Sequence, residues 1–377
     1  MNKYKVVHVG YYHSADDIRI IKKECMTLHS TGVYDLTYIT SDRNSTHAEQ
    51  ENNEIYIKIL PLVDKRFVRL FRYIKDLKKQ VISMEPDVCH IHEFVLYPII
   101  SKLKKRKIKV VLDFHENDIE VWRDKFEIKY GKIISKMFFL LISYYEKKCV
   151  KLADAIIVVD RRLEERIKKY GKTPILIPNY PIVLLETETV DYKNHEENVC
   201  FAGGYSDTWS IKKIMMALNL VPKAGFLLAG FGEKEYLDDL KKYESWNKTK
   251  YYGKISHDMV QQEIYGKSRI GLALLKYDKS WSEGPLGNTK LFEYMLAGLP
   301  VVCTDFPIWK EIVEYNNCGI CVEPDNIEDI AAAVSYILEN EEKAAEMGEN
   351  GRKLVMEKYN WNVLGKELKA MYKKLLS

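Results

Sequence analysis

The sequence alternates regularly between short runs of β-branched residues and longer amphipathic stretches. In the first half the short runs occupy residues 6–9, 36–40, 55–60, 88–92, 108–113, 155–159 and 175–178. Alternation of this kind is typical of βαβ units, in which helices connect the strands of a parallel sheet. We therefore predict an α/β fold with a doubly wound parallel sheet in this half.

The same alternation starts again near residue 199, after a polar stretch at 186–198 that reads as a linker. Its short runs lie at 199–202, 226–229, 250–252, 270–275, 300–303 and 319–322, and helical patterns at 341–359 and 362–376 close the chain. A length of 377 residues also suits two domains. We predict domains at residues 1–185 and 196–360, followed by a C-terminal helix at 361–377.

Membrane spans and export signals are not expected. The longest unbroken apolar run, from Met137 to Ile142, is far shorter than the ~20 residues that a membrane helix needs. The N-terminus enters a strand-like run at Lys5 and shows no signal-peptide cleavage site. These features predict a cytoplasmic protein.

The charge is distributed unevenly between the halves. Residues 1–180 hold 34 Lys and Arg against 24 Asp and Glu, whereas the remainder holds 24 against 30. Basic amphipathic segments at 65–75 and 102–107 are of the kind that lies on anionic membranes, although a packed helix with a solvated basic face gives the same pattern. We expect a peripheral membrane protein, and no nucleic-acid partner because no supporting motif is found.

Several cofactor motifs are missing. The turn after the first predicted strand, Gly10-Tyr11-Tyr12-His13, lacks the Gly-x-Gly-x-x-Gly pattern of a dinucleotide-binding enzyme. The sequence contains neither a P-loop nor an Asp-x-Asp pair. A dehydrogenase, P-loop chemistry and a sugar transferase that holds its donor through a metal are therefore disfavoured, and we expect no metal and no cofactor.

The most informative stretch runs from Glu283 to Val302. A glycine turn precedes a helix that opens near Asn288, and the free N–H groups and positive dipole end of such a helix can bind a diphosphate. Lys290 adds a cation in the first turn, and Glu293 is placed to accept hydrogen bonds from a ribose. The alternative is a plain amphipathic helix in which Lys290 and Glu293 are a solvated pair.

This stretch resembles the nucleotide-sugar signature of retaining glycosyltransferase family 4, in the variant Lys-x-x-Glu-Tyr-Met-x-x-Gly-x-Pro-Val. The resemblance extends over nearly the whole chain, through Asp17-Ile18-Arg19-Ile20, Asp113-Phe114-His115-Glu116, Asn179-Tyr180-Pro181, Phe201-Ala202-Gly203-Gly204, Asp305-Phe306-Pro307-Ile308-Trp309, residues 318–324 and Tyr359-Asn360-Trp361. The chain looks most like the branch found in bacterial capsule and exopolysaccharide loci. The resemblance implies a GT-B fold: two facing Rossmann-like domains with an inter-domain cleft, the last helix crossing back to the first domain.

The resemblance also implies roles for individual residues. Glu293 matches the ribose-binding glutamate, His115 the histidine that approaches the donor sugar, and Gly10 the glycine beside the diphosphate; we predict catalytic roles for His115, Lys290 and Glu293. Asp17 and Glu116 are expected on the acceptor side, and Arg19 is expected either in the site or in an interdomain salt bridge. The remaining predicted donor-binding residues are Gly204, Lys212, Lys254, Ile255, Glu283, Gly287, Asn288 and Thr289.

Two positions depart from the family pattern. The usual acidic residue eight positions before Glu293 is Pro285 here, and the nearest carboxylate is Glu283. The Arg and Lys that clamp the diphosphate after the Gly-Gly turn are replaced by a segment in which Lys212 or Lys213 would have to substitute. Losing such a charge would cost several kcal/mol of transition-state stabilisation.

These features predict a metal-independent, retaining, hexosyltransferase-type glycosyltransferase (EC 2.4). We expect it to take a UDP- or GDP-type sugar and a lipid-linked saccharide acceptor at the inner face of a bacterial cell membrane, in surface polysaccharide synthesis. The alternatives are a non-catalytic GT-B partner subunit, suggested by the missing clamp, and a GT-B nucleotide-sugar epimerase.

Overall fold

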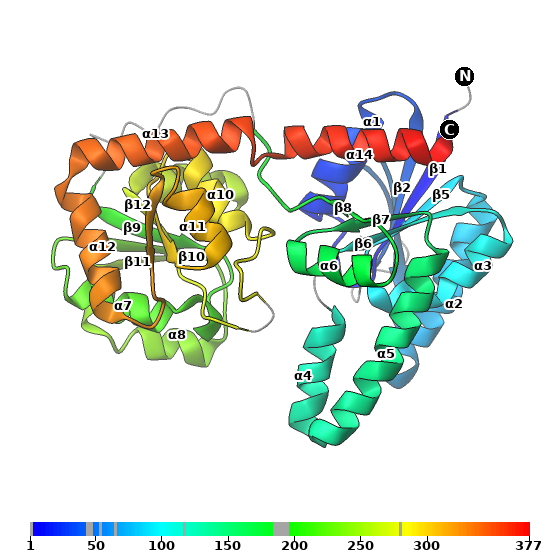
Figure 1. The fold of residues 1–377 in the computed structure, drawn as a ribbon, viewed down its shortest axis with the longest axis horizontal. Helices are drawn as coiled ribbons and strands as arrows, with labels where there is room; N and C mark the ends of the chain where they lie inside the picture. Colours follow the sequence, from blue (N-terminus) through cyan, green and yellow to red (C-terminus); the bar gives the residue numbers. More distant parts are fainter. Residues whose placement is uncertain are drawn as a thin grey trace. The chain divides into compact units, whose positions relative to one another are not determined.

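A computed structural model describes residues 3–42, 48–52, 55–63, 66–115, 118–183, 196–278 and 281–377. The chain divides into two compact units (Figure 1). The first unit comprises Met1–Asn179 and Asn362–Ser377, and the second comprises Tyr180–Trp361. Most of the predicted linker, residues 186–195, lies outside the described residues.

The first unit is built on a mainly parallel sheet with the strand order β3-β4-β2-β1-β5-β6-β7-β8. Its strands are β1 (Tyr4–Val9), β2 (Tyr34–Asp42), β3 (Ala48–Asn52), β4 (Ile55–Pro61), β5 (Val88–Ile91), β6 (Lys109–Phe114), β7 (Ala155–Val158) and β8 (Ile175–Leu176). The edge strand β3 is antiparallel to β4. We did not predict β3, because its sequence Ala-Glu-Gln-Glu-Asn contains no β-branched residue.

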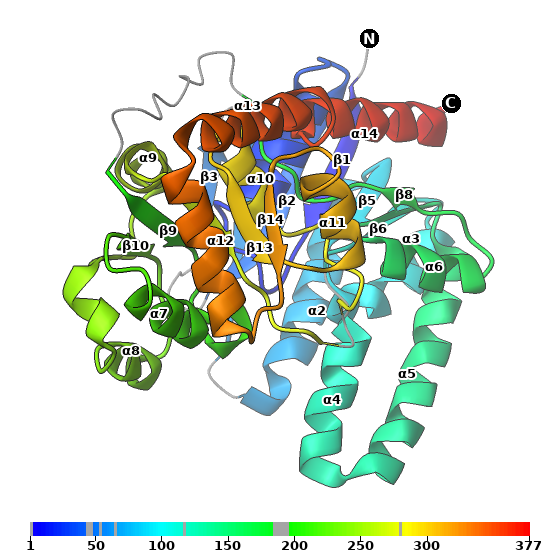
Figure 2. The same cartoon turned by 60° about the vertical axis from the view of Figure 1, so that its left-hand side comes forward.

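Helices cover this sheet, and its apolar side chains form the core of the unit. The helices are η1 (Ile18–Cys25), α1 (Met26–His29), α2 (Arg66–Met84), η2 (Phe94–Ile99), α3 (Ile100–Lys105), α4 (Asp118–Tyr130), α5 (Lys132–Leu152), α6 (Arg161–Lys169) and α14 (Trp361–Leu376). Val9, Ile91 and Leu112, on neighbouring strands, lie in one buried cluster. Helices α4 and α5 form a hairpin that extends away from the sheet in both views (Figures 1 and 2).

The second unit contains a parallel sheet with the strand order β11-β10-β9-β12-β13-β14. Its strands are β9 (Asn198–Ala202), β10 (Gly225–Ala229), β11 (Thr249–Gly253), β12 (Ile270–Ala273), β13 (Val301–Thr304) and β14 (Gly319–Val322). Its helices are η4 (Asp207–Trp209), α7 (Ile211–Asn219), α8 (Lys234–Leu240), η5 (Glu244–Lys248), α9 (His257–Met259), η6 (Val260–Ile264), η7 (Tyr265–Lys267), α10 (Thr289–Leu296), α11 (Pro307–Val313), α12 (Ile327–Glu339) and α13 (Glu341–Glu357).

Both sheets reverse their strand order beside their first strand, at β1/β5 and at β9/β12. Doubly wound sheets bind ligands at the carboxyl ends of the strands next to this reversal. The predicted α/β fold with two doubly wound domains is therefore confirmed. Each unit has one edge at which functional loops are expected to gather.

The boundary between the units lies near residue 180. The ring of Tyr180 packs against Phe292 and Tyr359 of the second unit, with centroid distances of 4.6 and 5.4 Å. The N–H of Trp361 donates to the carbonyl oxygen of Pro181 at 2.7 Å. Because these contacts fix the chain from Tyr180 onward, residues 180–183 belong with the second unit rather than with the first.

The end of the chain belongs to the first unit. Tyr372 on α14 is fully buried, and its hydroxyl lies 2.9 Å from Nδ1 of His90 on β5. Its ring also packs against Tyr34 on β2. Among the described residues, no helix combines the length and the apolarity needed to cross a bilayer.

Candidate functional site

In the second unit, the start of helix α10 lies at the carboxyl edge of the sheet. Asn288 is its N-cap, and the Oδ1 of Asn288 accepts a hydrogen bond from the N–H of Lys290 at 3.1 Å. Tyr294 fixes the helix to the sheet, because its hydroxyl accepts the N–H of Ala202 at the end of β9. Gly271 leaves room for the Tyr294 ring. The sequence thus places an open helix N-terminus beside strand β9.

Lys290 is held against aromatic rings. Its Nζ lies 4.1 Å from the centroid of the Trp209 ring and 5.5 Å from that of Phe201. Burial lowers the pKa of Lys290 to about 8, and the charge of Glu293 opposes this shift. The ammonium group is therefore charged at neutral pH but is poorly hydrated, which strengthens its interaction with any anion that enters.

Two glycines make room for this lysine. A Cβ atom on Gly203 would overlap the Lys290 side chain, and a Cβ on Gly230 would overlap the carbonyl of Gly203. Both residues also have positive φ angles, 137° and 131°. The Gly203-Gly204 turn predicted from the sequence therefore packs directly against Lys290, and Gly204 itself has open space around its Cα.

Glu293 lies one turn further along α10 and is oriented by two neighbours. Its Oε2 accepts a hydrogen bond from the hydroxyl of Tyr265 at 3.0 Å, and its Oε1 lies 3.5 Å from Nε2 of His257. Tyr265 is buried, while Glu293 is part exposed. Neither Tyr265 nor His257 was predicted, because both lie in short helices without a recognisable motif.

The other predicted residues of the second unit lie in loops or on other helices. Glu283 is exposed, and its backbone carbonyl accepts the N–H of Ile308. Gly287 and Thr289 flank Asn288 directly. Lys254 and Ile255 follow β11, and their loop is tied to the Gly203 turn because Gly230 donates to Gly253 and Gly203 donates to Ala229.

Lys212 and Lys213 are both paired with aspartates elsewhere. The Nζ of Lys212 donates to Oδ2 of Asp239 on α8 at 2.9 Å, and Lys213 lies 3.9 Å from Asp325. Tyr205, which follows the Gly-Gly turn, is buried, and its hydroxyl lies 3.0 Å from that of Tyr251. The structure therefore gives Lys212 and Lys213 other partners, and their use as a phosphate clamp stays a prediction.

In the first unit, a second group of polar side chains gathers after β1, β5 and β6. The carbonyl of Gly10 accepts the hydroxyl of Tyr73, and a Cβ on Gly10 would meet the hydroxyl of Tyr38 at 2.7 Å. The N–H groups of Tyr11 and Tyr12 both donate to Oε1 of Glu93 at 2.8 Å. Glu93, which was not predicted, therefore holds the loop that follows Gly10.

Asp17 and His13 form a pair in this group. Nδ1 of His13 lies 2.9 Å from Oδ2 of Asp17, whose Oδ1 accepts the N–H of Ile20 and so caps η1. Although burial opposes both shifts, the hydrogen bonds from His13 and Ile20 lower the pKa of Asp17 well below its usual range, and Asp17 together with Glu93 raises the pKa of His13. The two groups are thus an ion pair in mildly acidic solution.

His115 stands at the end of β6 beside this pair. Its Nε2 lies 3.0 Å from Oδ2 of Asp113 and 2.9 Å from Nδ1 of His92, and its ring is 4.6 Å from that of His13. Burial lowers the pKa of His115 to about 3, although Asp113 opposes this shift. The imidazole is therefore neutral at physiological pH. Among the described residues its contacts are made through Nε2, which leaves Nδ1 for a ligand.

Arg19 is buried, and each of its nitrogens faces a group of the first unit. Nη2 donates to both oxygens of Asp113 at 3.2 Å, Nη1 donates to the carbonyl of Ile177, and Nε lies 3.0 Å from Oε1 of Glu24. This arrangement favours a role in positioning Asp113 over the contact with a donor that we expected. Glu116 lies outside the described residues.

The structure thus brings the predicted residues into two groups, one in each unit. Asn288, Lys290, Glu293 and the Gly203-Gly204 turn form the group of the second unit. Gly10, Asp17 and His115 form that of the first unit, together with the unpredicted His13 and Glu93. The Asp-x-His-Glu and His-x-His-Glu sequences at 113–116 and 90–93 were a signal for Glu93, because each ends a buried strand with the same residue types.

Family models match both halves of the chain. The model described as "Glycosyltransferase Family 4" matches residues 24–180, and the model described as "Glycosyl transferases group 1" matches residues 192–354. The first match covers β2 and the strands of the first unit that follow it, and the second covers the sheet of the second unit and helix α10. The groups described above therefore lie largely within matched segments.

Relatives and solved structures agree with these matches. An uncharacterized glycosyltransferase of Methanocaldococcus jannaschii is 22% identical over 74% of this chain and 71% of its own, and the phosphatidyl-myo-inositol mannosyltransferase of Mycolicibacterium smegmatis is 22% identical over 79% and 74%. The sucrose-phosphate synthase of Thermosynechococcus elongatus superposes with a TM-score of 0.78 at 16% identity, covering 99% of both chains. The Anabaena protein HepE, solved with UDP and glucose, gives 0.68 at 11% identity over 98% and 100%.

The Asp17–His13 pair predicts a stability that depends on pH. Because the folded pKa of Asp17 is lowered, its contribution is present above about pH 4 and is lost on acidification; because that of His13 is raised, its contribution is present below about pH 6.5 and is lost at higher pH. We expect Asp17→Asn to reduce the free energy of unfolding by roughly 1–2 kcal/mol near pH 5.5, and by less at pH 3 and pH 9. Denaturant titrations of both proteins measure this difference. A difference that is equal at all three pH values would contradict the ion pair.

Proposed function

Since the chain is a glycosyltransferase with the GT-B fold and family 4-like domains, we propose that it transfers a sugar from a nucleotide-diphosphate sugar to a saccharide acceptor with retention of configuration. The observation that carries this proposal is the start of helix α10, where an open helix N-terminus, a buried cation and a carboxylate follow one another. Each of these groups suits one part of a nucleoside diphosphate.

The diphosphate would bind at the N-terminus of α10. The first N–H groups of a helix have no carbonyl partner within the helix, and its dipole attracts anions. Nδ2 of Asn288 is buried without a hydrogen-bond partner among the described residues, so it can donate to a phosphate oxygen. Lys290 supplies the positive charge, and its cation–π contact with Trp209 does not neutralise that charge.

The ribose would bind Glu293. A carboxylate can accept hydrogen bonds from two vicinal hydroxyls, and the Tyr265 hydroxyl fixes its orientation from the buried side. The loop with Lys254 and Ile255 would contact the base through backbone groups. UDP is the first base to test, because HepE was solved with UDP and glucose. GDP is the second.

In the proposed reaction, the bond between the anomeric carbon and the diphosphate oxygen breaks while a bond to the acceptor oxygen forms on the same face. The departing diphosphate accepts the proton of the acceptor hydroxyl, so no side chain has to act as a general base. The helix N-terminus, Asn288 and Lys290 would stabilise the charge that develops on the diphosphate, without a metal ion. Neutral His115 would approach the donor sugar as a hydrogen-bonding group.

We also propose that the protein works at an anionic membrane on a lipid-linked acceptor, in bacterial surface polysaccharide synthesis. The support is the α4–α5 hairpin of the first unit. One face of α5 exposes apolar side chains at helical spacing, with exposed fractions of 79% for Ile133, 63% for Met137, 60% for Leu140, 70% for Leu141 and 72% for Tyr144. An apolar face of this kind needs a partner.

Cations flank this apolar face. Lys129, Lys132, Lys136 and Lys148 are exposed on the same hairpin, whereas Glu146 is buried and bonded to Arg166 and Tyr170. An apolar face bordered by lysines suits the surface of an anionic bilayer. The predicted basic segment at 65–75 adds Val68, Phe71, Arg72 and Lys75 on the exposed side of α2, and the segment at 102–107 forms the end of α3.

The donor site predicts which nucleotide changes will be seen. We expect UDP or GDP at millimolar concentration to raise the melting temperature of the protein by several degrees, since a ligand at 100 times its Kd adds ~2.7 kcal/mol. Glu293→Ala and Glu293→Gln should lose this shift; the Gln variant keeps an acceptor for Tyr265 and so controls for lost stability. Glu311→Ala, an exposed glutamate on α11, should behave like the wild type.

The same experiment decides between the alternatives. If no nucleoside diphosphate shifts the wild-type protein, the non-catalytic partner subunit replaces the enzyme as the explanation. If nucleotide binds and free sugar is released equally with and without acceptor, the epimerase reading is correct. Radiolabelled sugar from the nucleotide that binds, found in a lipid extract only when acceptor is present, supports the transferase.

Lys290 makes nucleotide binding dependent on pH. Because its pKa in the free protein is about 8 and a bound diphosphate would raise it, binding requires uptake of a proton above pH 8. We expect the Kd to rise by up to about tenfold per pH unit above pH 8 in the wild type. Lys290→Arg, which stays charged, and Lys290→Met, which is never charged, should both lack this rise. Since all three proteins bind the same nucleotide, ionisation of the nucleotide cancels, and an identical pH dependence in all three would contradict the role of Lys290.

The hairpin predicts binding to anionic lipid. We expect the wild type to sediment with phosphatidylglycerol vesicles but weakly with phosphatidylcholine vesicles, and Leu140→Glu/Leu141→Glu to bind at least about tenfold less. Tyr315→Glu, which changes a residue that is 80% exposed in the second unit, is the matched control and should bind normally. Concentration-dependent dimerisation that the double variant abolishes, without any vesicle binding, would instead assign the apolar face to a protein contact.

A further inference from the structure

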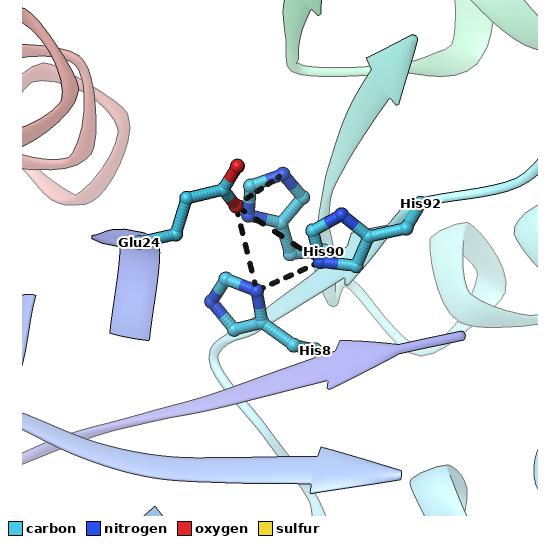
Figure 3. A group of neighbouring side chains, drawn as sticks. All are labelled: His8, Glu24, His90 and His92. Atoms are coloured by element: carbon cyan, nitrogen blue, oxygen red, sulfur yellow. Dashed lines mark hydrogen bonds and ion pairs between the residues drawn. The ribbon is translucent and has the colours of Figure 1, made fainter. Parts of the chain in front are cut away.

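Three histidines and a glutamate converge inside the first unit. His8 lies on β1, Glu24 on η1, and His90 and His92 on β5 (Figure 3). All four side chains are buried, with exposed fractions of 0 to 2%. The strands explain the meeting, because β1 pairs with β5 in parallel and His8 stands directly opposite His90. Residues 90 and 92 alternate by two and so share one face of β5.

One atom from each side chain points to a common centre. The atoms are Nδ1 of His8, Nε2 of His90, Nε2 of His92 and Oε2 of Glu24, which all lie within 4.8 Å of one another. Oε2 lies 3.9, 3.9 and 4.0 Å from the three nitrogens in the order given, and Nδ1 of His8 lies 3.0 Å from Nε2 of His92. Tetrahedral zinc bonds of about 2.0–2.1 Å place their ligand atoms roughly 3.3 Å apart. Shifts of about half an ångström would therefore suffice.

Hydrogen bonding within the protein leaves part of this cluster unsatisfied. Among the described residues, Nε2 of His90 and both carboxylate oxygens of Glu24 are buried without a hydrogen-bond partner. Oε1 of Glu24 at least faces Arg19, but Oε2 faces only the three imidazoles. A buried carboxylate oxygen without a donor is costly. A cation at the centre would satisfy Oε2 and the His90 nitrogen together.

The groups behind these four side chains resemble the outer shell of a metal site. Nδ1 of His90 lies 2.9 Å from the hydroxyl of Tyr372, and Nδ1 of His92 lies 3.5 Å from Oδ2 of Asp113 and 2.9 Å from Nε2 of His115. Arg19 holds the far oxygen of Glu24. Metal-bound histidines commonly donate their second N–H to a carboxylate or another oxygen, which fixes the ring orientation. His8 alone has no such partner, since its Nε2 is unpaired among the described residues.

We propose that His8, Glu24, His90 and His92 bind a divalent transition-metal ion, with zinc as the first choice. Three imidazole nitrogens and one carboxylate oxygen match the ligands that zinc takes in proteins. Four protein ligands, all buried, describe a closed site, so the ion holds the fold together and has no open position for a substrate. The inference does not depend on the proposed function and leaves the transfer step free of metal.

The ion would connect the elements that carry the polar group of the first unit. It bridges β1, η1 and β5 directly, and it reaches α14 through the His90–Tyr372 contact. Through His92 it also sets the tautomer of the ring that faces His115. Asp17 lies at the start of η1 and His115 at the end of the neighbouring strand β6, so both depend on how firmly η1 sits on the sheet.

The test is the metal content and metal response of the full chain, purified without a polyhistidine tag. We expect mass spectrometry to find close to one zinc per chain. Removal with a strong chelator should lower the melting temperature by several degrees, and added zinc should restore it. Cobalt(II) added to the metal-free protein should give the intense visible absorption of a tetrahedral site. None of these measurements requires enzyme activity.

Two variants separate this site from other binding. His90→Gln and Glu24→Gln should each lose the bound zinc and the cobalt absorption, whereas His13→Gln, which changes a histidine near the cluster but outside it, should keep both. If the ligand variants do not fold, the cobalt spectrum and the zinc response of the wild type still decide. The proposal is overturned if the wild type binds neither zinc nor cobalt, or if folded ligand variants bind as much metal as the wild type.

Discussion

Parallel strand pairing determines where chemistry can occur in this molecule. In each sheet all the strands except β3 run in one direction, so their carboxyl ends share an edge, and the loops that follow them are forced together. Gly10, His92 and His115 follow β1, β5 and β6 in this way, as Gly203 and Gly253 follow β9 and β11. Residues far apart in sequence therefore become neighbours without a long-range signal between them, and both candidate groups result from this one constraint.

The first unit adds a second constraint, which is a buried charge. Asp113 is 2% exposed, and such a carboxylate is tolerated only if it is paired and hydrogen-bonded. Arg19 supplies the positive charge, and its attraction lowers the pKa of Asp113 well below the usual range even though burial opposes this shift. Arg19 reaches Asp113 only because η1 packs on the sheet, so the ion pair, the position of η1 and the orientation of His115 stand or fall together.

This dependence explains which features could be predicted from the sequence. The strands were predictable because their β-branched runs are long enough to show the alternation, whereas the polar β3 was not. Glu293 and Lys290 were predictable because they lie on one helix with a recognisable spacing. Glu93, Tyr265 and His257 were not, since their roles come from contacts with residues 28 to 82 positions away. Arg19 was identified as important, but the chain pattern alone could not show that its partners lie inside its own unit.

The second unit compensates for a charge that its relatives carry after the Gly-Gly turn. Tyr205 occupies the first position after that turn and packs into the core, so the turn itself brings no cation. The space is used differently: Gly203 lacks a Cβ, and this lets Lys290 approach from α10 until it lies on Trp209. A lysine buried in this way has lost part of its hydration before any ligand arrives. It therefore pays less to contact an anion than a solvated lysine would, and one such cation beside a helix N-terminus can replace part of the missing pair.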